Sequence, residues 1–191
     1  IVAHLGHFIE PLRNRQDQGD YWWELRPCAY YEHFDAPKII FPDICKAPRF
    51  CLDRGGLYLA NTAYCLGTGD HYLLGILNSR LFWFAISNIS IPFGIRAGKY
   101  RYRLIYQYME RVPIRPINAA SAADQSRRDQ LAQLAEQMLV LHQRLSAART
   151  PQEKTALERQ ITATDTQIDR LVYDLYGLTD DDVRIVEAAG A

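Results

Sequence analysis

The chain has 191 residues, 48% of them hydrophobic and 23% charged, and its 22 Lys and Arg residues balance its 22 Asp and Glu residues. This composition is typical of a folded globular protein and excludes an intrinsically disordered one. No run of residues approaches the roughly 18 uninterrupted apolar positions of a transmembrane helix, so we expect no membrane partner.

The overall balance of charge conceals two regions of opposite sign. Residues 1–117 hold 14 Lys and Arg against 10 Asp and Glu, whereas residues 118–191 hold 8 against 12. We therefore predict an α+β domain at 1–117 and a separate helical region at 118–191. Because Ile1 is not a methionine and no signal peptide follows it, we expect a fragment of a longer protein, located in the cytoplasm.

The first predicted elements are a helix and an aromatic cluster. Residues Val2–Gln18 have an apolar side and predict a helix that Pro11 kinks or interrupts. Residues Tyr21–Arg26 then place three aromatic side chains in succession. Large rings suit the core of a small domain, and the alternative is that one of them stacks on a base or enters a nucleic-acid groove.

Short strands are predicted next. Pro37–Ile44 is an apolar run bounded by prolines, which is typical of a strand. Phe50–Leu52 and Leu57–Thr62 are separated by Asp53–Gly56 and predict a hairpin.

A helix and two further strands complete the predicted domain. Apolar residues recur at helical spacing from Leu73 to Ala85, so we predict a helix that begins at Asp70. Tyr100–Tyr106 and Tyr108–Ile114 are strand-like. Short strands around one or two helices indicate an α+β fold with a small mixed or antiparallel sheet.

The last third of the chain predicts an antiparallel helical hairpin. Its first helix, from about residue 124 to residue 148, carries a heptad seam at Leu131, Leu134, Met138, Leu141 and Leu145. Thr150, Pro151 and Glu153 form a capping box that begins a second helix, which ends at Gly177. A short third helix is predicted from Thr179. The tight turn between the long helices requires them to lie antiparallel.

A basic stretch in the middle of the chain suggests the ligand. The 39 positions from 71 to 109 contain no acidic residue, and they carry Arg80, Arg96, Lys99, Arg101 and Arg103. Cations without counter-charges attract an anion, and nucleic acid is the leading candidate. Tyr100 alternates with these cations, and Lys38 could extend the patch. The simpler interpretation is a strand whose tyrosines face the core and whose arginines face water.

Signals for catalysis or metal binding are weak. Cys28, Cys45, Cys51 and Cys65 form no Cys-x-x-Cys pair, which favours reduced structural thiols over zinc ligands. His4 and His7 lack an evident third ligand. We predict no catalytic residue, no metal and no cofactor-binding residue in this chain.

The order of several segments resembles a known family, the TaqI-like C-terminal specificity domain. The segments that carry the resemblance are Tyr21–Arg26, Lys38–Ile44, Asn61–Thr62, Leu73–Ser79, Phe82–Trp83, Tyr100–Arg101, Tyr108–Ile114 and Tyr173–Thr179. The helical hairpin after Pro113–Pro116 is also similar to that of type I specificity subunits, where paired helices space or dock the recognition domains.

The resemblance implies double-stranded DNA as the partner. In that family the domain selects the target of an adenine-specific DNA methyltransferase, often a type IIG restriction-modification enzyme, whose catalytic domain uses S-adenosylmethionine. This chain lacks the Asn-Pro-Pro-Tyr-type motif, so methyl transfer, and any nuclease, would belong to another domain of the same polypeptide. The competing hypothesis is a helical protein-interaction adapter without its own DNA specificity.

Overall fold

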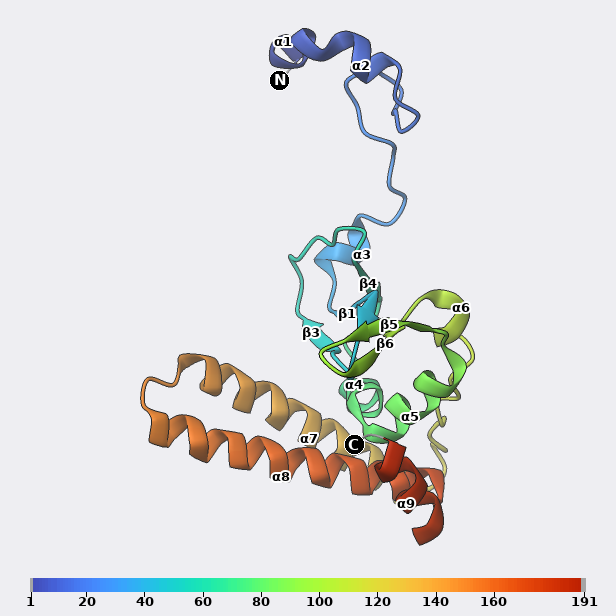
Figure 1. Cartoon of the computed structure of the whole chain (residues 1–191), viewed down its shortest axis with the longest axis vertical. Coiled ribbons are helices and arrows are strands. Elements are labelled where there is room, and N and C mark those ends of the chain that lie inside the picture. The colour runs from blue at the N-terminus through green and yellow to red at the C-terminus, as the bar shows by residue number, and fades with distance from the viewer. Residues whose placement is uncertain (1, 190–191) are drawn as a thin grey trace.

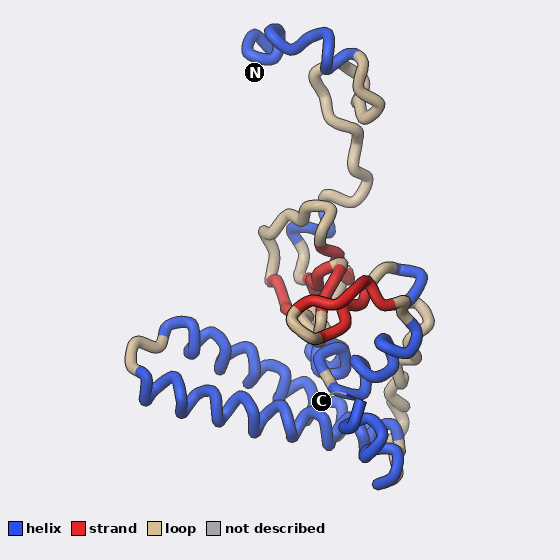
Figure 2. Tube along the Cα trace, viewed as in Figure 1, coloured by secondary structure: helices blue, strands red, loops and turns tan. Residues whose placement is uncertain are grey.

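Helices and two small antiparallel sheets make up the chain, as a computed structural model that describes residues 2–189 shows (Figure 1). One sheet has the strand order β3-β1-β4 and the other has the order β2-β6-β5. The strands gather between the N-terminal segment and the C-terminal helices (Figure 2). The strands are β1 (Lys38–Pro42), β2 (Ile44–Cys45), β3 (Cys51–Asp53), β4 (Ala63–Leu66), β5 (Pro92–Arg96) and β6 (Lys99–Arg103). This arrangement confirms the predicted α+β fold.

Strand β1 is the centre of the first sheet. Ile40 pairs in register with Cys51 of β3 on one edge and with Cys65 of β4 on the other. The predicted hairpin between residues 50–52 and 57–62 is therefore wrong, because β3 and β4 both pair with β1 instead of with each other. The backbone amide of Leu57 donates to the Asp53 carboxylate over 3.2 Å, which holds the intervening chain as a loop.

Two helices, α4 (His71–Asn78) and α5 (Arg80–Ile89), replace the single predicted one. Asp70 caps α4 by accepting a hydrogen bond from the Tyr72 amide over 2.9 Å. Ser79 ends that helix and caps the next one, accepting from the Phe82 amide over 3.2 Å. A second cap within the apolar run starts a new helix axis.

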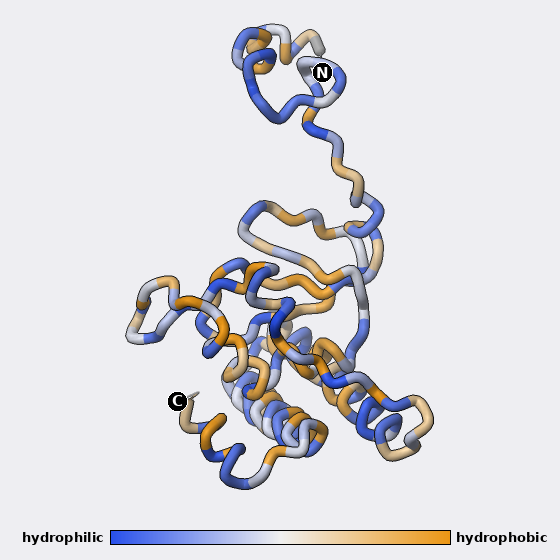
Figure 3. The backbone as a smooth tube through the Cα atoms, turned by 90° about the vertical axis from the view of Figure 1, so that its right-hand side faces the viewer, coloured by the Kyte–Doolittle hydropathy of each residue, from blue (hydrophilic) through white to orange (hydrophobic). Residues whose placement is uncertain are grey.

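The core of the sheet domain lies between the strands and these two helices. Ile39 of β1, Ile86 of α5 and Leu104 after β6 are each 0% exposed and belong to one cluster. Figure 3 shows hydrophobic stretches along this central part of the chain.

The N-terminal segment stands apart from the sheets (Figure 1). It contains α1 (Val2–Leu5), η1 (Gly6–Phe8) and α2 (Ile9–Arg13), so the predicted helix is shorter than expected. The helical dihedral angles break at Phe8, whereas Pro11 lies in the first turn of α2, where a missing amide is tolerated.

The aromatic cluster does not enter the core. Tyr21 stacks on Trp23 with ring centroids 4.7 Å apart, and Trp23 meets Trp22 edge-on at 5.4 Å. Tyr21 remains 56% exposed, and none of the three rings belongs to a core cluster of the described residues. The expected packing of these rings in a domain core is therefore wrong. A short helix, α3 (Glu32–Asp35), follows.

The predicted strand over residues 108–114 is also wrong. Helix α6 (Tyr106–Met109) occupies its first part, and residues 110–116 form neither a helix nor a strand. Because Pro113 and Pro116 lack an amide donor, this segment cannot extend a sheet ladder.

The C-terminal helices follow the prediction closely. They are α7 (Ala122–Ala147), α8 (Pro151–Tyr176) and α9 (Asp180–Ala189). The Thr150 hydroxyl accepts from the Glu153 amide over 3.2 Å, and Gly177 closes α8 with a φ of 69°. We call the antiparallel pair α7 and α8 the arm. Figure 1 shows its far end projecting away from the sheets.

The near end of the arm packs against the sheet domain. Leu131 of α7 is 0% exposed and shares a cluster with Ile76 of α4 and Val172 of α8. A Cβ on Gly75 would lie 2.9 Å from Leu131, so only glycine permits this close approach. The predicted boundary at residue 117 remains a prediction, and a shared core crosses it.

None of the helices within residues 2–189 is both long and apolar enough to cross a membrane.

Candidate nucleic-acid interface

Strands β5 and β6 form a two-stranded hairpin, which we call the ribbon (residues 92–103). Its turn is made by Ala97 and Gly98, whose φ angles are 52° and 72°. Positive φ at both central residues is the pattern of a type I′ turn, whose twist suits a hairpin. The residues before Lys99 thus form strand β5 and a tight turn.

The outer end of the ribbon has no third strand. Strand β2 pairs only with Tyr102 and Arg103, at the inner end of β6. Ile95 and Tyr100 pair with each other farther out and are 60% and 54% exposed. A two-stranded ribbon of this kind has dimensions that the major groove of B-DNA admits.

The two faces of the ribbon differ in chemistry. Tyr102 packs edge-on against Trp83 of α5 with ring centroids 5.6 Å apart, so one face turns toward the core. On the other face, the guanidinium carbons of Arg101 and Arg103 lie 5.5 Å and 5.8 Å from the ring centroid of Phe93. The interpretation in which the tyrosines face the core therefore holds for the inner Tyr102, whereas Tyr100 is exposed.

Two of the predicted cations are paired with carboxylates. Arg103 donates to Asp43 through Nε, at 3.2 Å from Oδ1, and through Nη2, at 2.9 Å from Oδ2. Arg80 Nε lies 3.1 Å from Asp169 Oδ2 on α8. The expectation that this stretch lacks counter-charges is thus wrong for Arg80 and Arg103, because acids distant in sequence reach them.

Lys38 is not part of a surface patch. Its side chain is 0% exposed, forms an ion pair with Asp53 and donates to the backbone oxygen of Phe34 over 2.5 Å. The expectation that Lys38 extends the surface patch of DNA-binding cations is therefore wrong. The side chain stabilises the edge between β1 and β3 instead, since Lys38 and Asp53 are partners in register.

Three predicted cations remain together and unpaired. Arg96, Lys99 and Arg101 have no carboxylate within 4.0 Å among residues 2–189. Arg101 lies across Gly94, where an added Cβ would be 3.5 Å from its Nη2. The Arg101 Nε is shielded from solvent and has no hydrogen-bond acceptor in the described part of the chain. These cations form a positive outer end on the ribbon.

Sequence reasoning did not find Phe93, which lies next to the candidate cations. The ring supports two guanidinium groups, and it is itself 47% exposed. The sequence does contain a hairpin signal, because the turn-forming pair Ala97-Gly98 lies between Ile95 and Tyr100. A hairpin at this turn would have placed Phe93 and Arg101 on neighbouring strands.

The histidines and cysteines form no evident metal or nucleophilic site. Within residues 2–189, no group of three or more His, Cys, Asp or Glu side chains is placed to hold a metal ion. All four cysteines are free thiols. Burial raises the pKa of Cys45 to about 11, which keeps this thiol protonated and a poor nucleophile.

Comparison with known families decides the relationship. The model of the TaqI-like C-terminal specificity domain matches residues 4–114, which is more than half of the chain. The chain belongs to this family. Domains of this kind are the target-recognition domains of restriction-modification enzymes. A search of curated proteins finds no match.

The match covers the part of this TaqI-like specificity domain that carries the ribbon. It spans both sheets and helices α4 to α6 and ends before the arm. The resemblance inferred from the segments between residues 21 and 114 is thereby confirmed, whereas Tyr173–Thr179 lies beyond the match. The unpaired cations lie inside the matched region.

Proposed function

We propose that this chain binds double-stranded DNA in a sequence-specific manner, with the outer end of the ribbon in the major groove. The observation that carries the proposal is the set of unpaired cations at that end, Arg96, Lys99 and Arg101. Membership in a target-recognition family supports it independently.

The side chains of the ribbon suit different parts of the DNA. Arg96 and Arg101 have planar guanidinium groups, which can donate two hydrogen bonds to the O6 and N7 atoms of guanine. Lys99 is a compact point charge that suits a phosphate. Tyr100 and Ile95 pair across the two strands on the face opposite these cations, and their exposed side chains can contact the methyl group of thymine.

In this proposal, methyl transfer takes place in another domain of the parent enzyme. The parent is an adenine-specific DNA methyltransferase or a type IIG restriction-modification enzyme of the cytoplasm. Its catalytic domain, on the same polypeptide, binds S-adenosylmethionine. The present domain supplies the choice of site and holds the target so that an adenine can reach that domain.

The arm is less suited to the competing adapter function. Leu131, Leu141 and Leu157 are 0%, 4% and 2% exposed, because the two helices and α4 bury them within the chain. These buried leucines of the seam are therefore not available for recruiting a partner.

A charge-matched pair of variants tests the proposal. Arg96→Ala/Lys99→Ala/Arg101→Ala removes three cations from the ribbon, and Arg144→Ala/Arg159→Ala/Arg170→Ala removes three exposed cations from the arm. Binding to labelled duplex DNA is measured by fluorescence anisotropy at several salt concentrations. We expect the ribbon variant to bind at least about 30-fold more weakly with a flatter salt dependence, because each lost phosphate contact reduces the slope.

The arm variant is the control for net charge. It should retain affinity within about threefold, since its cations lie away from the ribbon. Equal loss in both variants, or no duplex binding by the unmodified chain at low salt, would contradict the proposal.

A further inference from the structure

A groove lies between the sheet domain and the arm, and among the described residues it shares only Lys99 with the ribbon. Its volume is about 720 Å³, and its walls come from residues 46–51, from helices α4, α5, α7 and α8, and from α9. Leu74, Met138 and Leu139 make part of the wall apolar. A volume of this size matches sites for small ligands, which commonly lie between structural units.

The groove has a cationic border. Lys46, Arg49 and Lys99 line it, and none of them has a carboxylate within 4.0 Å among residues 2–189. Arg80 also lines it and stays 54% exposed although it pairs with Asp169. Among residues 2–189, the one acid on the border is Asp165 of the arm. The positive excess favours an anionic ligand.

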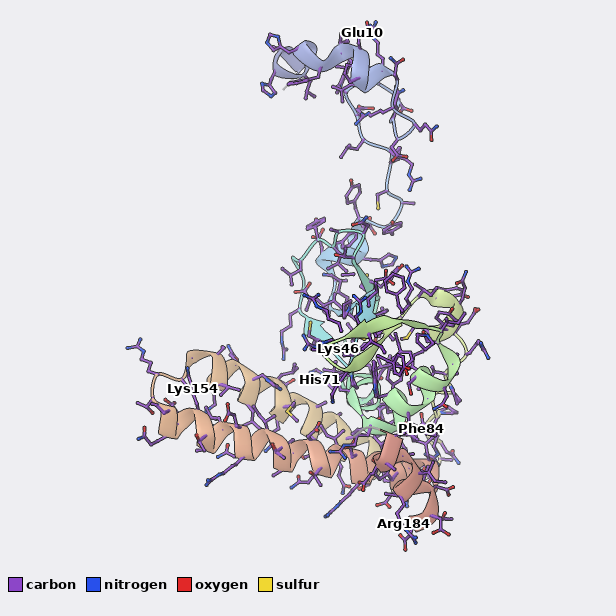
Figure 4. The ribbon with its side chains drawn as sticks, in the orientation of Figure 1. Glu10, Lys46, His71, Phe84, Lys154 and Arg184 are labelled. Atoms are coloured by element: carbon purple, nitrogen blue, oxygen red, sulfur yellow. The ribbon has the colours of Figure 1, made fainter. Side chains whose placement is uncertain are left out.

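Two aromatic side chains complete the walls. Trp83 and Phe84 are consecutive residues of α5, both are half-buried, and both line the groove. Figure 4 labels Lys46 and Phe84 on the sheet domain, close to the near end of the arm. Aromatic rings next to cations provide stacking for a base and charge for its phosphate, which is the combination found where unpaired nucleic acid binds.

We propose that this groove binds a nucleotide unit, with its base against Trp83 or Phe84 and its phosphate held by Lys46 and Arg49. An acidic peptide would match the charge but would leave the aromatic walls without a planar partner, and a protein interface usually needs about 800 Å² on each side. The source of the nucleotide is either a free mononucleotide or an unpaired stretch of a DNA strand. The proposal does not rest on how the ribbon reads duplex DNA.

Fluorescence of Trp83 tests this site directly. In a Trp22→Phe/Trp23→Phe background, Trp83 is the sole remaining tryptophan. Adenosine 5′-monophosphate, a four-residue deoxyadenosine strand and the same strand within a duplex are titrated separately. We expect saturable quenching, since stacking on an indole quenches its emission. Lys46→Gln/Arg49→Gln should weaken it at least about fivefold, whereas the charge-matched Lys154→Gln/Arg159→Gln at the far end of the arm should not.

Each outcome bears on the proposal. Tighter binding of the single strand than of the mononucleotide identifies an unpaired strand as the source, and equal binding identifies the free nucleotide. No quenching by either ligand, equal weakening in both variants, or equally effective displacement by a short polyglutamate peptide would overturn it. Circular dichroism melting checks that Lys46→Gln/Arg49→Gln is folded. Because these residues lie outside the ribbon, failure here leaves the duplex result standing on its own measurement.

Discussion

The arm and the ribbon use the same kinds of residues in opposite ways. In the arm, Leu131 and Val172 are 0% exposed, and the acids Asp124 and Asp169 pair with arginines of the preceding domain. In the ribbon, Ile95 is 60% exposed and Arg96 has no acidic partner among the described residues. Groups that stabilise the fold have their partners within the chain. The outer end of the ribbon presents cations that have no acidic partner among the described residues.

The largest expected effect is in the arm. Leu131→Ala removes a fully buried side chain from the contact between α7 and α4 and leaves a cavity. We expect the free energy of unfolding to fall by about 3 kcal/mol, as measured by urea denaturation. DNA affinity at low temperature should stay unchanged, because the ribbon is intact. A loss below about 1 kcal/mol would mean that this contact does not hold the arm in place.

The stability that Asp169 of the arm contributes should depend on pH. Burial raises the pKa of Asp169 to about 6, although Arg80 opposes the effect and Asp165 and Glu187 add to it. The ordinary pKa is about 3.9. The folded chain therefore binds this proton more tightly than the unfolded chain between pH 4 and pH 6, and the contribution of Asp169 to stability falls as pH rises through that window.

Asp169→Asn isolates this contribution. The difference in free energy of unfolding between the unmodified chain and the variant should decrease by about 2 kcal/mol from pH 4 to pH 6.5. Urea denaturation at four pH values measures it. A difference that stays constant with pH would show that Asp169 does not titrate in this range.

The ribbon should respond in binding and not in stability. Arg101→Ala should weaken duplex binding by about tenfold, since a bidentate contact to guanine is worth about 1–3 kcal/mol. Arg101→Lys keeps the charge and loses the planar fork, so we expect relaxed sequence preference with an unchanged salt slope. Unchanged preference in Arg101→Lys would assign this residue to a phosphate instead of a base.

The smallest effect is expected at the surface between the two regions. Arg54 Nη2 lies 2.9 Å from Glu136 Oε1 of α7, and the two side chains are 70% and 45% exposed. Because exposed ion pairs contribute little, Arg54→Ala should change the free energy of unfolding by about 0.5 kcal/mol, and less at 1 M salt. A loss above about 1.5 kcal/mol would show that this pair helps to fix the arm.

Local signals allowed the arm to be predicted from sequence. Its heptad seam, the cap at Thr150 and the stop at Gly177 act over a few residues, and the structure places α8 between those two signals. The sheets were harder, because strand pairing is not local. Nothing near residues 50–62 indicates that β3 and β4 would both pair with β1.

In the candidate site, too, local features could be predicted from the sequence and long-range contacts could not. The basic stretch was visible in the sequence, and Arg96, Lys99 and Arg101 lie together on the ribbon. Lys38, Arg80 and Arg103 pair with acids that lie 15, 89 and 60 residues away in the chain. A local count of charges cannot find such partners, since only the folded chain brings them together.

The most direct test of the central claim is selection from a randomised duplex library, performed with the unmodified chain and with Arg96→Ala/Arg101→Ala. Our account predicts that the unmodified chain enriches one short sequence and that the variant loses this enrichment. No enrichment by the unmodified chain, or the same sequence enriched equally by the variant, would contradict the assignment of sequence recognition to the ribbon.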